Sequence, residues 1–376
     1  MPEAERPPLT YAAAGVDVEA GDRAVELMRA SVARTHGPEV VGGVGGFAGL
    51  FDASALARYR RPLLATSTDG VGTKVAIAQA LDVHDTIGAD LVGMVVDDLA
   101  VCGATPLFMT DYIACGRVVP ERVAAIVRGI AAACEQAGCA LVGGETAEHP
   151  GLLGPDEYDV AGAATGVVEA DRLLGPHRVA VGDVLVAMAS TGLHSNGFSL
   201  ARRVLARAGW SLEREVPELG RTIGAELLTP TRVYARDVLR LAAELGGGLH
   251  ALSHVTGGGL ASNLARVLPT GTLAVADRST WTPAPVFGLL AGLGDVPWDD
   301  VERTFNVGVG MVAVVDAASA GAAVRILTEG GVPAWVLGDV RTDDGRPPAG
   351  AVDGVTRGTK GVSGGAAVLV GSHPAA

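Results

Sequence analysis

Hydrophobic side chains recur along this chain with two different spacings, one typical of helices and the other of strands. Between residues 19 and 36, Val25, Met28 and Val32 are three and four residues apart, and a Gly-Pro pair follows at once. This spacing predicts a helix with one apolar face that ends before the glycine. The same criteria predict helices at residues 85–103 and 120–138, and strands at residues 63–67, 106–114, 139–144 and 158–168.

The second half of the chain repeats this alternation. Strands are predicted at residues 183–190, near 254, at 310–315 and at 334–340, and helices after Asn196, after Gly259 and at 317–329. Such alternation favours the α/β or α+β fold class. A chain of 376 residues exceeds what one hydrophobic core usually organises, and a run of Gly, Pro, His and Arg interrupts the pattern near residues 174–182. We therefore expect an N-terminal domain at residues 1–172, a C-terminal domain at 173–345 and a flexible tail, rich in Gly and Pro, at 346–376.

The composition of the chain limits the cellular environments and the classes of partner that we expect for it. Apolar residues make up 48% of the chain, but polar residues interrupt every run before the roughly 18 residues that a membrane span requires. The N-terminal segment MPEAERPPLT is acidic and Pro-rich, unlike a secretory signal, so we expect a cytoplasmic protein that contacts no membrane. A formal net charge of −13 without a basic cluster argues against nucleic-acid binding. The four cysteines lack CxxC spacing, which favours buried reduced thiols over a zinc site.

One candidate site is the segment TDGVGTK, which begins at Thr68 and directly follows a predicted strand. Its two glycines would let the backbone approach an anion closely, Lys74 could neutralise phosphate charge, and Asp69 could bind a divalent metal. A tight turn with a surface ion pair explains the same residues. The glycine spacing does not fit a Walker A loop, which places four residues between its first glycine and the GK pair.

A second candidate is a set of carboxylates in the second predicted helix. Asp90 and Asp97 are seven residues apart, hence on one face, and Asp98 is adjacent. Charged residues in so apolar a helix are costly unless they face water or bind cations. Together with Asp69 and Asp111, residues Asp97 and Asp98 are predicted to bind one or more magnesium ions, and a solvated helix face is the alternative.

Glycine-rich and polar segments supply further candidate contacts for phosphate. The run GGVGGFAG at residues 42–49 does not fit a dinucleotide fingerprint, and it is predicted to be a flap that closes over phosphates or a plain flexible loop. The segment HVTGGG contains a glycine-rich turn at residues 256–259 that leads into a predicted helix. His194, Ser195 and Asn196 also precede a helix, where polar groups favour anions or act as an N-cap.

Eight segments occur together in the order and spacing of a known family: TDGVGTK, HDTIGADLVGM, GATPLFMTDYIACG, GCALVGGETAEHPG, DVAGAATGVVE, HSNGFSL, HVTGGG and RTFNVGVGM. They resemble the aminoimidazole ribonucleotide synthetase family, also called phosphoribosylformylglycinamidine cyclo-ligases. The resemblance extends from Tyr11 to the end of the strand predicted at residues 334–340, and so covers nearly the whole chain.

The resemblance implies two α/β domains in each subunit and a homodimer whose N-terminal sheets pair into a shared barrel. It implies that ATP phosphorylates the amide oxygen of formylglycinamidine ribonucleotide, and that the amidine nitrogen then attacks the activated carbon while phosphate leaves. The expected products are aminoimidazole ribonucleotide, ADP and phosphate, as purine biosynthesis requires. ATP and magnesium are the expected cofactors, a monovalent cation is left open, and neither nucleic acid nor a membrane is an expected partner.

The resemblance also assigns roles to residues of this chain. Asp69 and Asp98 would bind metal, and Lys74 would contact phosphate. His194 and Asn196 would lie near the reacting groups, with His194 the candidate for moving a proton because an imidazole titrates near neutral pH. The expected contacts of ATP or its phosphates are Gly42, Gly43, Gly45, Gly46, Thr68, Gly70, Gly72, Thr73, Gly143, Gly144, Glu145 and Thr146. The expected contacts of the substrate phosphate, or of part of ATP, are Thr256, Gly257, Gly258 and Gly259.

The chain departs from the family pattern at three places. It has Asp97 where the family has Asn, which adds a negative charge and leaves the number of metal ions open. It has His149 in place of Met. It also reads YAAAGVD where YKDAGVD is expected, so that the role of the missing lysine would pass to another residue such as Arg29.

Other members of the same superfamily agree less well with the sequence. Selenophosphate synthetases carry a reactive Cys or selenocysteine before or in their Gly-rich loop, whereas the first cysteine here is Cys102. Hydrogenase-maturation dehydratases need a C-terminal Cys, and this chain ends in Ser-His-Pro-Ala-Ala. A thiamine-monophosphate kinase would share the magnesium carboxylates without requiring the GGETAE and RTFN segments. A nucleotide sensor without catalysis would bind ATP but not turn it over.

Overall fold

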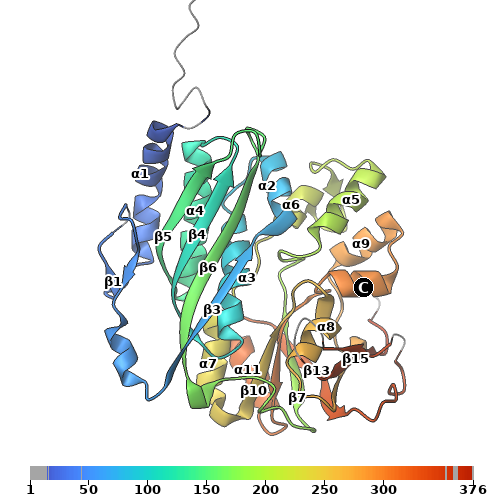
Figure 1. The fold of residues 1–376 in the computed structure, drawn as a ribbon. Helices are drawn as coiled ribbons and strands as arrows, with labels where there is room; N and C mark the ends of the chain where they lie inside the picture. Colours follow the sequence, from blue (N-terminus) through green and yellow to red (C-terminus); the bar gives the residue numbers. More distant parts are fainter. Residues whose placement is uncertain (1–14, 16, 44, 352–353, 359–362, 375–376) are drawn as a thin grey trace, which may run out of the picture.

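The chain forms two lobes side by side, each built on one main β-sheet (Figure 1). The computed structural model describes residues 15, 17–43, 45–351, 354–358 and 363–374. The acidic N-terminal segment, Tyr11 and Val44 of the glycine-rich loop therefore lie outside the described residues. None of the helices in the described ranges is both long and apolar enough to cross a membrane.

The N-terminal lobe is built on a four-stranded sheet with the strand order β3-β6-β4-β5. Its strands are β3 (Pro62–Gly70), β4 (Thr105–Cys115), β5 (Ala140–Glu148) and β6 (Tyr158–Glu169). Its helices are α1 (Val18–Arg34), α2 (Val75–Leu81), α3 (Ile87–Ala100) and α4 (Pro120–Ala137), and a small hairpin of β1 (Val40–Val41) and β2 (Leu50–Phe51) bounds the glycine-rich loop. The helices α3 and α4 lie behind this sheet in Figure 1, and its front face is open.

The C-terminal lobe is built on a seven-stranded sheet with the order β10-β12-β7-β13-β11-β15-β14. Its strands are β7 (Val184–Ala189), β10 (Leu249–His254), β11 (Thr272–Asp277), β12 (Val309–Val315), β13 (Ala334–Thr342), β14 (Thr356–Arg357) and β15 (Ala366–Val370). Its helices are α5 (Phe198–Ala208), α6 (Ile223–Leu227), α7 (Ala235–Leu245), α8 (Gly259–Arg266), α9 (Pro285–Gly294), α10 (Trp298–Thr304) and α11 (Ala320–Glu329). A separate small hairpin pairs β8 (Glu215–Val216) with β9 (Arg221–Thr222). Short 3-10 turns are η2 (Ala53–Arg58), η3 (Gly72–Lys74), η4 (Ala170–Arg172), η5 (Gly246–Gly248) and η6 (Arg278–Thr280).

Helix α3 is the centre of the molecule because nearly all of its surface is covered. Of its 14 residues, only Ala89 and Asp98 are not fully buried. On one side it touches α4 at the backbone, since a Cβ on Gly88 would lie 2.1 Å from the carbonyl carbon of Gly129. A side chain at either glycine would force the two helices apart.

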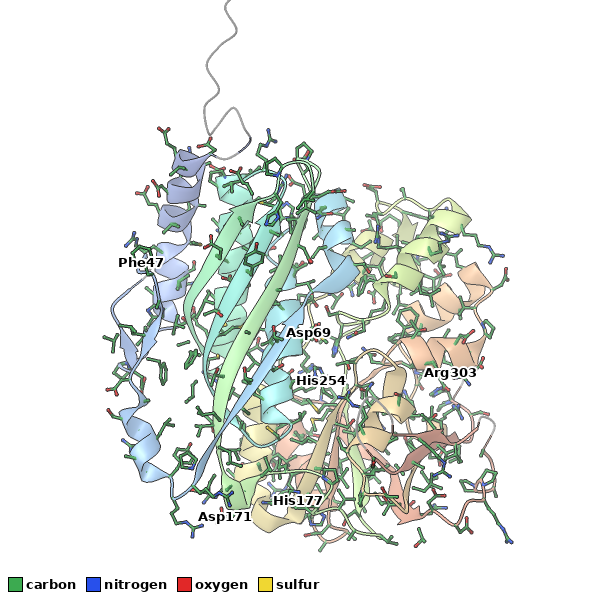
Figure 2. The ribbon with its side chains drawn as sticks, viewed as in Figure 1. Phe47, Asp69, Asp171, His177, His254 and Arg303 are labelled. Carbon is green, nitrogen blue, oxygen red and sulfur yellow. The ribbon has the colours of Figure 1, made fainter. Side chains whose placement is uncertain are left out.

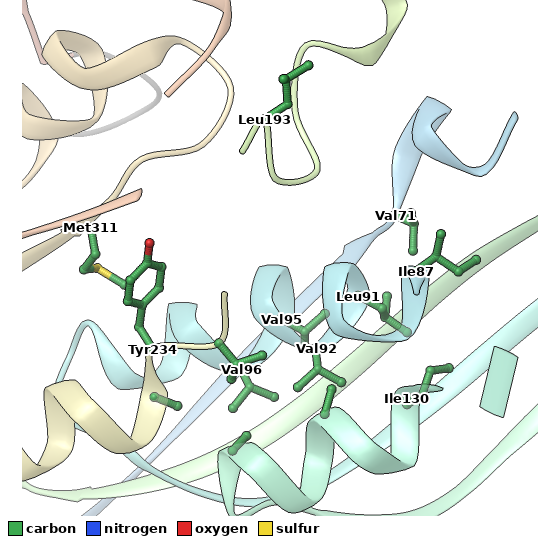
Figure 3. Packing of buried hydrophobic residues seen from close by; sticks show 14 of the residues in the cluster. Val71, Ile87, Leu91, Val92, Val95, Val96, Ile130, Leu193, Tyr234 and Met311 are labelled. Carbon is green, nitrogen blue, oxygen red and sulfur yellow. The ribbon is translucent and has the colours of Figure 1, made fainter. Parts of the chain in front are cut away.

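On its other side α3 packs against the C-terminal lobe. Figure 3 shows Tyr234 and Met311 of that lobe beside the apolar side chains of α3, including Val96. One continuous cluster of buried side chains contains these residues together with Val71 and Leu193. The two lobes therefore share a hydrophobic core, which holds them in one relative position.

Most of the predicted helices and strands are confirmed, with shifts at their ends. The helix predicted at residues 120–138 is α4, and Gly138 ends it in the left-handed conformation at φ 75°. The patterns did not indicate α7, α9, α10 or β11, which are short or lack a clear period. The first sheet ends at Glu169 and the second begins at Val184. The boundary at 172/173 falls in this connection and stays a prediction.

The expectation of a flexible tail at residues 346–376 is wrong for residues 366–370, which form a strand. β15 (Ala366–Val370) pairs in parallel with β11 inside the C-terminal sheet, and four of its five residues are buried. Many glycines and prolines surround this strand. Its five apolar residues are too few to change the average composition of the segment, so composition alone predicts flexibility. Backbone hydrogen bonds to β11 supply the order that local sequence does not.

Replacing Val368 by Asp tests whether β15 is a structural strand. Val368 is 1% exposed, so an aspartate there would bury an unpaired carboxylate. We expect the free energy of unfolding, measured by urea denaturation, to fall on the order of 3–5 kcal/mol. The control is Val336→Asp in β13 of the same sheet, where the side chain is 48% exposed, and a small effect is expected. Equal effects of the two substitutions would contradict a buried β15.

Candidate active site

The first group of predicted site residues lines a cavity of about 840 Å³ between α1, the glycine-rich loop and β5. The predicted ATP contacts found here are Gly43, Gly45, Gly46, Gly143, Gly144, Glu145 and Thr146. The loop lies directly on β5, because a Cβ on Gly49 would be 2.5 Å from the carbonyl oxygen of Val142. Among the described residues that line the cavity there is no lysine or arginine, whereas Asp17, Asp22 and Glu145 contribute negative charge. A triphosphate bound here would need a metal ion or basic groups from outside the cavity.

Asp111 lies against this cavity and away from the other predicted metal ligands. It shares a row of the sheet with Asp69, since each is paired with Gly162. Between them, however, a Cβ on Gly162 would meet Met109 Cε at 2.4 Å and Leu91 Cδ2 at 3.3 Å. The Oδ2 atom of Asp111 is buried without a hydrogen-bond partner, and burial raises the pKa of this carboxyl to about 7. Core side chains therefore separate Asp111 from Asp69, so that one magnesium ion is not expected to bind both, and magnesium binding by Asp111 stays a prediction.

A second group of residues lies at the boundary between the lobes, where Figure 2 shows Asp69 and His254. His254 Nδ1 donates a hydrogen bond to Asp98 Oδ1 at 3.0 Å, and the Asp98 side chain is 43% exposed. Burial lowers the pKa of His254, but the hydrogen bond and charge of Asp98, with the charges of Asp97 and Asp69, outweigh burial and raise it. A cavity of about 330 Å³ opens here, lined by Asp98, His254 and Thr256 among others. This cleft combines the exposed carboxylate of Asp98 with an imidazole whose pKa is raised, a pair of groups suited to a divalent cation and to a phosphate respectively.

A third environment is the buried interface between the lobes, and it contains Asp97. Both carboxylate oxygens of Asp97 accept the backbone N–H of Tyr234, at 2.9 and 3.0 Å, just before α7 begins. Burial raises the pKa of Asp97 to about 7, although the charge of His254 and the backbone donors oppose this. The Asp97 side chain is fully buried and caps a helix of the other lobe, which favours a structural role, and metal binding by Asp97 stays a prediction.

Lys74 belongs to the same interface. Its Nζ donates to Asp90 Oδ1 at 2.7 Å and to the carbonyl oxygens of His194 and Thr229 at 2.9 and 2.7 Å. These three bonds use all of its donors, and the side chain is 0% exposed. Burial lowers the pKa of Lys74, while the charge and hydrogen bond of Asp90 act in the opposite direction. These bonds tie the segment TDGVGTK to the C-terminal lobe and leave no Nζ donor over for a phosphate. The predicted phosphate contact of Lys74 stays a prediction.

The remaining groups of TDGVGTK point in different directions. Thr68 donates its hydroxyl hydrogen to a carbonyl of β6 at 2.9 Å, and Gly70 donates its N–H to Asp69 Oδ1 at 2.7 Å. Gly72 has φ 73°, and the hydroxyl of Thr73 lies 3.0 Å from a serine hydroxyl of α5. The segment does not form a single phosphate cradle. Its contacts with ATP, and those of Gly42, stay predictions.

His194 and Asn196 lie in the loop between β7 and α5. His194 is buried with φ 64°, and its Nε2 accepts the N–H of Thr191 at 3.1 Å. Its Nδ1 is buried and has no hydrogen-bond partner among the described residues. Burial, followed by the positive charges of His254 and Lys74, holds the pKa of His194 well below its ordinary value. The lowered pKa makes His194 a weaker base than a free imidazole, and its role in moving a proton stays a prediction.

The loop that carries Asn196 brings three of the predicted segments together. Ser195 Oγ donates to the carbonyl oxygen of Val71 in TDGVGTK at 2.7 Å. Asn196 Oδ1 lies 3.2 Å from the place that a Cβ on Gly257 would occupy. The structure therefore places HSNG between TDGVGTK and HVTGGG, as a shared site requires.

The turn at residues 256–259 needs glycine for both conformation and space. Gly258 has φ 106° and Gly259 has φ 71°, values that favour glycine. A Cβ on Gly259 would also lie 1.7 Å from the carbonyl oxygen of Glu302. Thr256 faces the cleft, and the N–H groups at the start of α8 suit an anion. Phosphate binding by this turn stays a prediction.

His254 is a candidate site residue that the sequence motifs did not single out. The signal is present in the sequence, because His254 is the last residue of a buried strand and directly precedes a glycine-rich turn. Binding residues often lie where a strand ends and a loop begins. Its partner Asp98 lies 156 residues earlier, and that proximity is visible only in the folded chain.

Comparison with known proteins agrees with this geometry. Residues 52–168 match the family described as AIR synthase related protein, N-terminal domain, and residues 180–346 match its C-terminal domain. The chain is 50% identical over 338 residues to the phosphoribosylformylglycinamidine cyclo-ligase of Anaeromyxobacter sp. strain Fw109-5, covering 90% of this chain and 97% of that protein. It is 49% identical over 341 residues to the cyclo-ligase of Geobacillus kaustophilus, covering 90% and 98%.

Solved structures share the fold at much lower identity. The thiamine-monophosphate kinase of Stenotrophomonas maltophilia K279a superposes with a TM-score of 0.64 at 20% identity, over 85% of this chain and 93% of that one. The hydrogenase maturation protein HypE in complex with ATP superposes with a TM-score of 0.56 at 18% identity, over 86% and 87%. Both likenesses concern the fold alone.

Replacing Lys74 by Met tests whether this lysine joins the lobes or contacts phosphate. The substitution leaves the Asp90 carboxylate buried without its partner, so we expect the free energy of unfolding to fall by about 3–5 kcal/mol in urea denaturation. The matched control is Arg34→Met, which removes an exposed ion pair with Glu135 and is expected to change stability little. Unchanged stability of Lys74→Met, with weaker ATP binding, would support a phosphate contact instead.

Proposed function

The chain belongs to the AIR synthase related family of phosphoribosylformylglycinamidine cyclo-ligases, and on that basis we propose which of its residues carry the reaction. It is an ATP-dependent ligase of purine biosynthesis that converts formylglycinamidine ribonucleotide into aminoimidazole ribonucleotide, ADP and phosphate. The observation that carries this function is 50% identity to a cyclo-ligase over 90% of the chain. A cytoplasmic location stays a prediction.

The reaction has two steps with different demands. In the first, the amide oxygen of the substrate forms a bond to the γ-phosphorus of ATP while the bond to ADP breaks. In the second, the amidine nitrogen forms a C–N bond to the activated carbon, the C–O bond to phosphate breaks, and the nitrogen loses a proton. Phosphorylation converts a poor leaving group into a good one, so the protein mainly positions the groups and neutralises charge.

We propose Asp69 and Asp98 as the ligands of magnesium. Both side chains are exposed, Asp98 lines the cleft, and the charge of Asp69 acts on His254 of the same cleft. Both supply the hard oxygen atoms that magnesium prefers. Nowhere in the described ranges do three or more His, Cys, Asp or Glu side chains gather as a metal site. This fits an ion that two carboxylates hold only partly and that phosphate oxygens and water complete. When bound, the ion would supply neutralisation of phosphate charge.

We propose that His254 and the turn at residues 256–259 bind an anionic group of the substrate or of ATP. Asp98 stabilises the protonated form of His254, and in that form the imidazole would bring positive charge into the cleft. The turn supplies backbone N–H groups next to it. Asn196, whose amide lies beside Gly257, is suited to orient the reacting group by hydrogen bonds.

We propose that two copies of the chain pair through the open face of the four-stranded sheet. Leu64 on β3 is 64% exposed and Tyr112 on β4 is 41% exposed, and exposed apolar surface of this kind marks an interaction site. The predicted ATP contacts fall at opposite edges of this sheet, on β3 and beside β5. A second subunit could bring basic groups to the cavity beside β5, which the described residues of one chain do not provide.

Replacing Asp69 by Asn tests the metal assignment. We expect turnover to be abolished while the thermal melting temperature stays nearly unchanged, because the side chain is exposed and holds no distant segment in place. The assay measures ADP release from magnesium-ATP with and without formylglycinamidine ribonucleotide. The control is Asp156→Asn, an exposed aspartate that pairs with Arg122 and should retain activity. A large loss of stability in Asp69→Asn would indicate a structural turn instead.

Replacing Leu64 by Arg tests the proposed dimer. A charge on the paired face, at Leu64 of the edge strand β3, should dissociate the dimer, which light scattering measures as a halved molecular mass. If each site needs both subunits, turnover should fall with the dimer fraction and recover at high protein concentration. Val336→Arg places the same charge on an exposed position of the other sheet and should leave the mass unchanged. A Leu64→Arg protein with the parental mass would exclude this face as the interface.

A further inference from the structure

A buried polar cluster in the C-terminal lobe is centred on the carboxylate of Glu302. Arg278 donates from Nε and Nη2 to its two oxygens at 2.7 and 2.6 Å, and Trp298 Nε1 donates to Oε1 at 3.1 Å. His373 Nε2 lies 3.3 Å from the same Oε1. Burial would raise the pKa of Glu302, but the hydrogen bonds from Arg278 and His373 and the charge of Arg278 lower it to about 2. The carboxylate is therefore ionised.

His373 enters this cluster from the last segment of the chain. Its ring stands edge-on to two tryptophans, with centres 4.5 Å from Trp281 and 5.7 Å from Trp298. It follows β15, as Arg278 follows β11, and these two parallel strands are in register at Asp277 and Val370. Because neighbouring parallel strands end at the same edge of a sheet, both side chains emerge at one place and reach the same carboxylate.

The cluster lies directly behind the turn that carries the proposed anion contacts. The Cβ position of Gly259 falls 1.7 Å from the carbonyl oxygen of Glu302 and 3.2 Å from Cα of Arg303. The turn therefore rests on the backbone of α10 with no side chain between them. Trp281 Nε1 also donates to the carbonyl oxygen of Val307, which has φ 47°, so the cluster holds the segment after α10 as well. Because the two backbones are in direct contact, a movement of α10 would also move the turn.

We propose that His373 is a positioning residue for ligand binding: by holding Glu302 it fixes α10, and with it the turn at residues 256–259. This inference rests on the proposed function, in which that turn binds an anionic group of the substrate or of ATP. His373 contacts no ligand and acts through Glu302. Without His373, Arg278 still bonds Glu302, so the lobe stays folded, but Glu302 of α10 loses one of its two contacts with side chains from the sheet edge.

The test compares full-length His373→Ala and His373→Gln with the parent and with a control, His177→Ala, an exposed histidine of the same lobe. Steady-state ADP release yields kcat and the KM of each substrate, and amide hydrogen exchange is followed at residues 256–260. We expect His373→Ala to raise the KM of formylglycinamidine ribonucleotide or of ATP about tenfold, with kcat changed less than about twofold, since one hydrogen bond to a charged group is lost. Exchange at the turn should be faster. The amide of His373→Gln can donate to Glu302 and should restore both values.

Two outcomes would overturn the inference. One is parental KM values and parental exchange at residues 256–260 in His373→Ala. The other is a joint change of kcat, both KM values and melting temperature that His373→Gln does not reverse, which would indicate general destabilisation. A parent protein that releases no ADP in response to the substrate would refute the proposed function instead, and the exchange measurement would still decide whether His373 holds the turn.

Discussion

The buried ion pair between Lys74 and Asp90 is the contact on which the arrangement of the two lobes depends. Two charges inside a protein cost several kcal/mol each unless hydrogen bonds replace the lost water. Here Lys74 is bonded to Asp90 and to two carbonyls of the C-terminal lobe, and Asp90 also accepts from the backbone and hydroxyl of Thr231. The pair is thus satisfied only when the lobes are in place. Since one of those carbonyls belongs to His194, the same contact fixes the loop that carries Asn196.

The three aspartates of α3 have different environments because their side chains point in different directions. Asp90 and Asp97 lie on one face, and each binds a backbone N–H of the segment that leads into α7. Asp98 is the next residue, about 100° further around the helix, and it emerges in the cleft beside His254. A hydrated metal ion cannot reach a carboxylate that is closed to water, such as Asp97, whereas the exposed carboxylate of Asp98 is accessible to one.

Backbone contacts explain why several glycine-rich motifs surround the cleft. Gly259 touches the carbonyl of Glu302, and a Cβ on Gly197 would lie 2.3 Å from Phe305. Both partners belong to the end of α10 and the residue after it, and Asn306 continues this support by donating to the carbonyl of Gly192 at 2.9 Å. Glu302 and the segment RTFNVGVGM that follows it therefore pack tightly against two loops beside the cleft.

The amino-acid sequence alone predicts the fold class, the family and the positions of long elements such as α4. Hydrophobic periodicity, helix-end residues and the order of motifs can all be read along the chain without its tertiary structure. It also marks Asp69 and Asp98 as candidate metal ligands, and both side chains are exposed in the structure. Tertiary structure alone decided that Asp97 caps α7, that Lys74 is an internal bond and that residues 366–370 form a strand. The partner of Asp97 lies 137 residues away, and β15 depends on pairing with β11. Whether a charged side chain binds a ligand or stabilises the fold depends on its burial and its partners, and distant segments supply both.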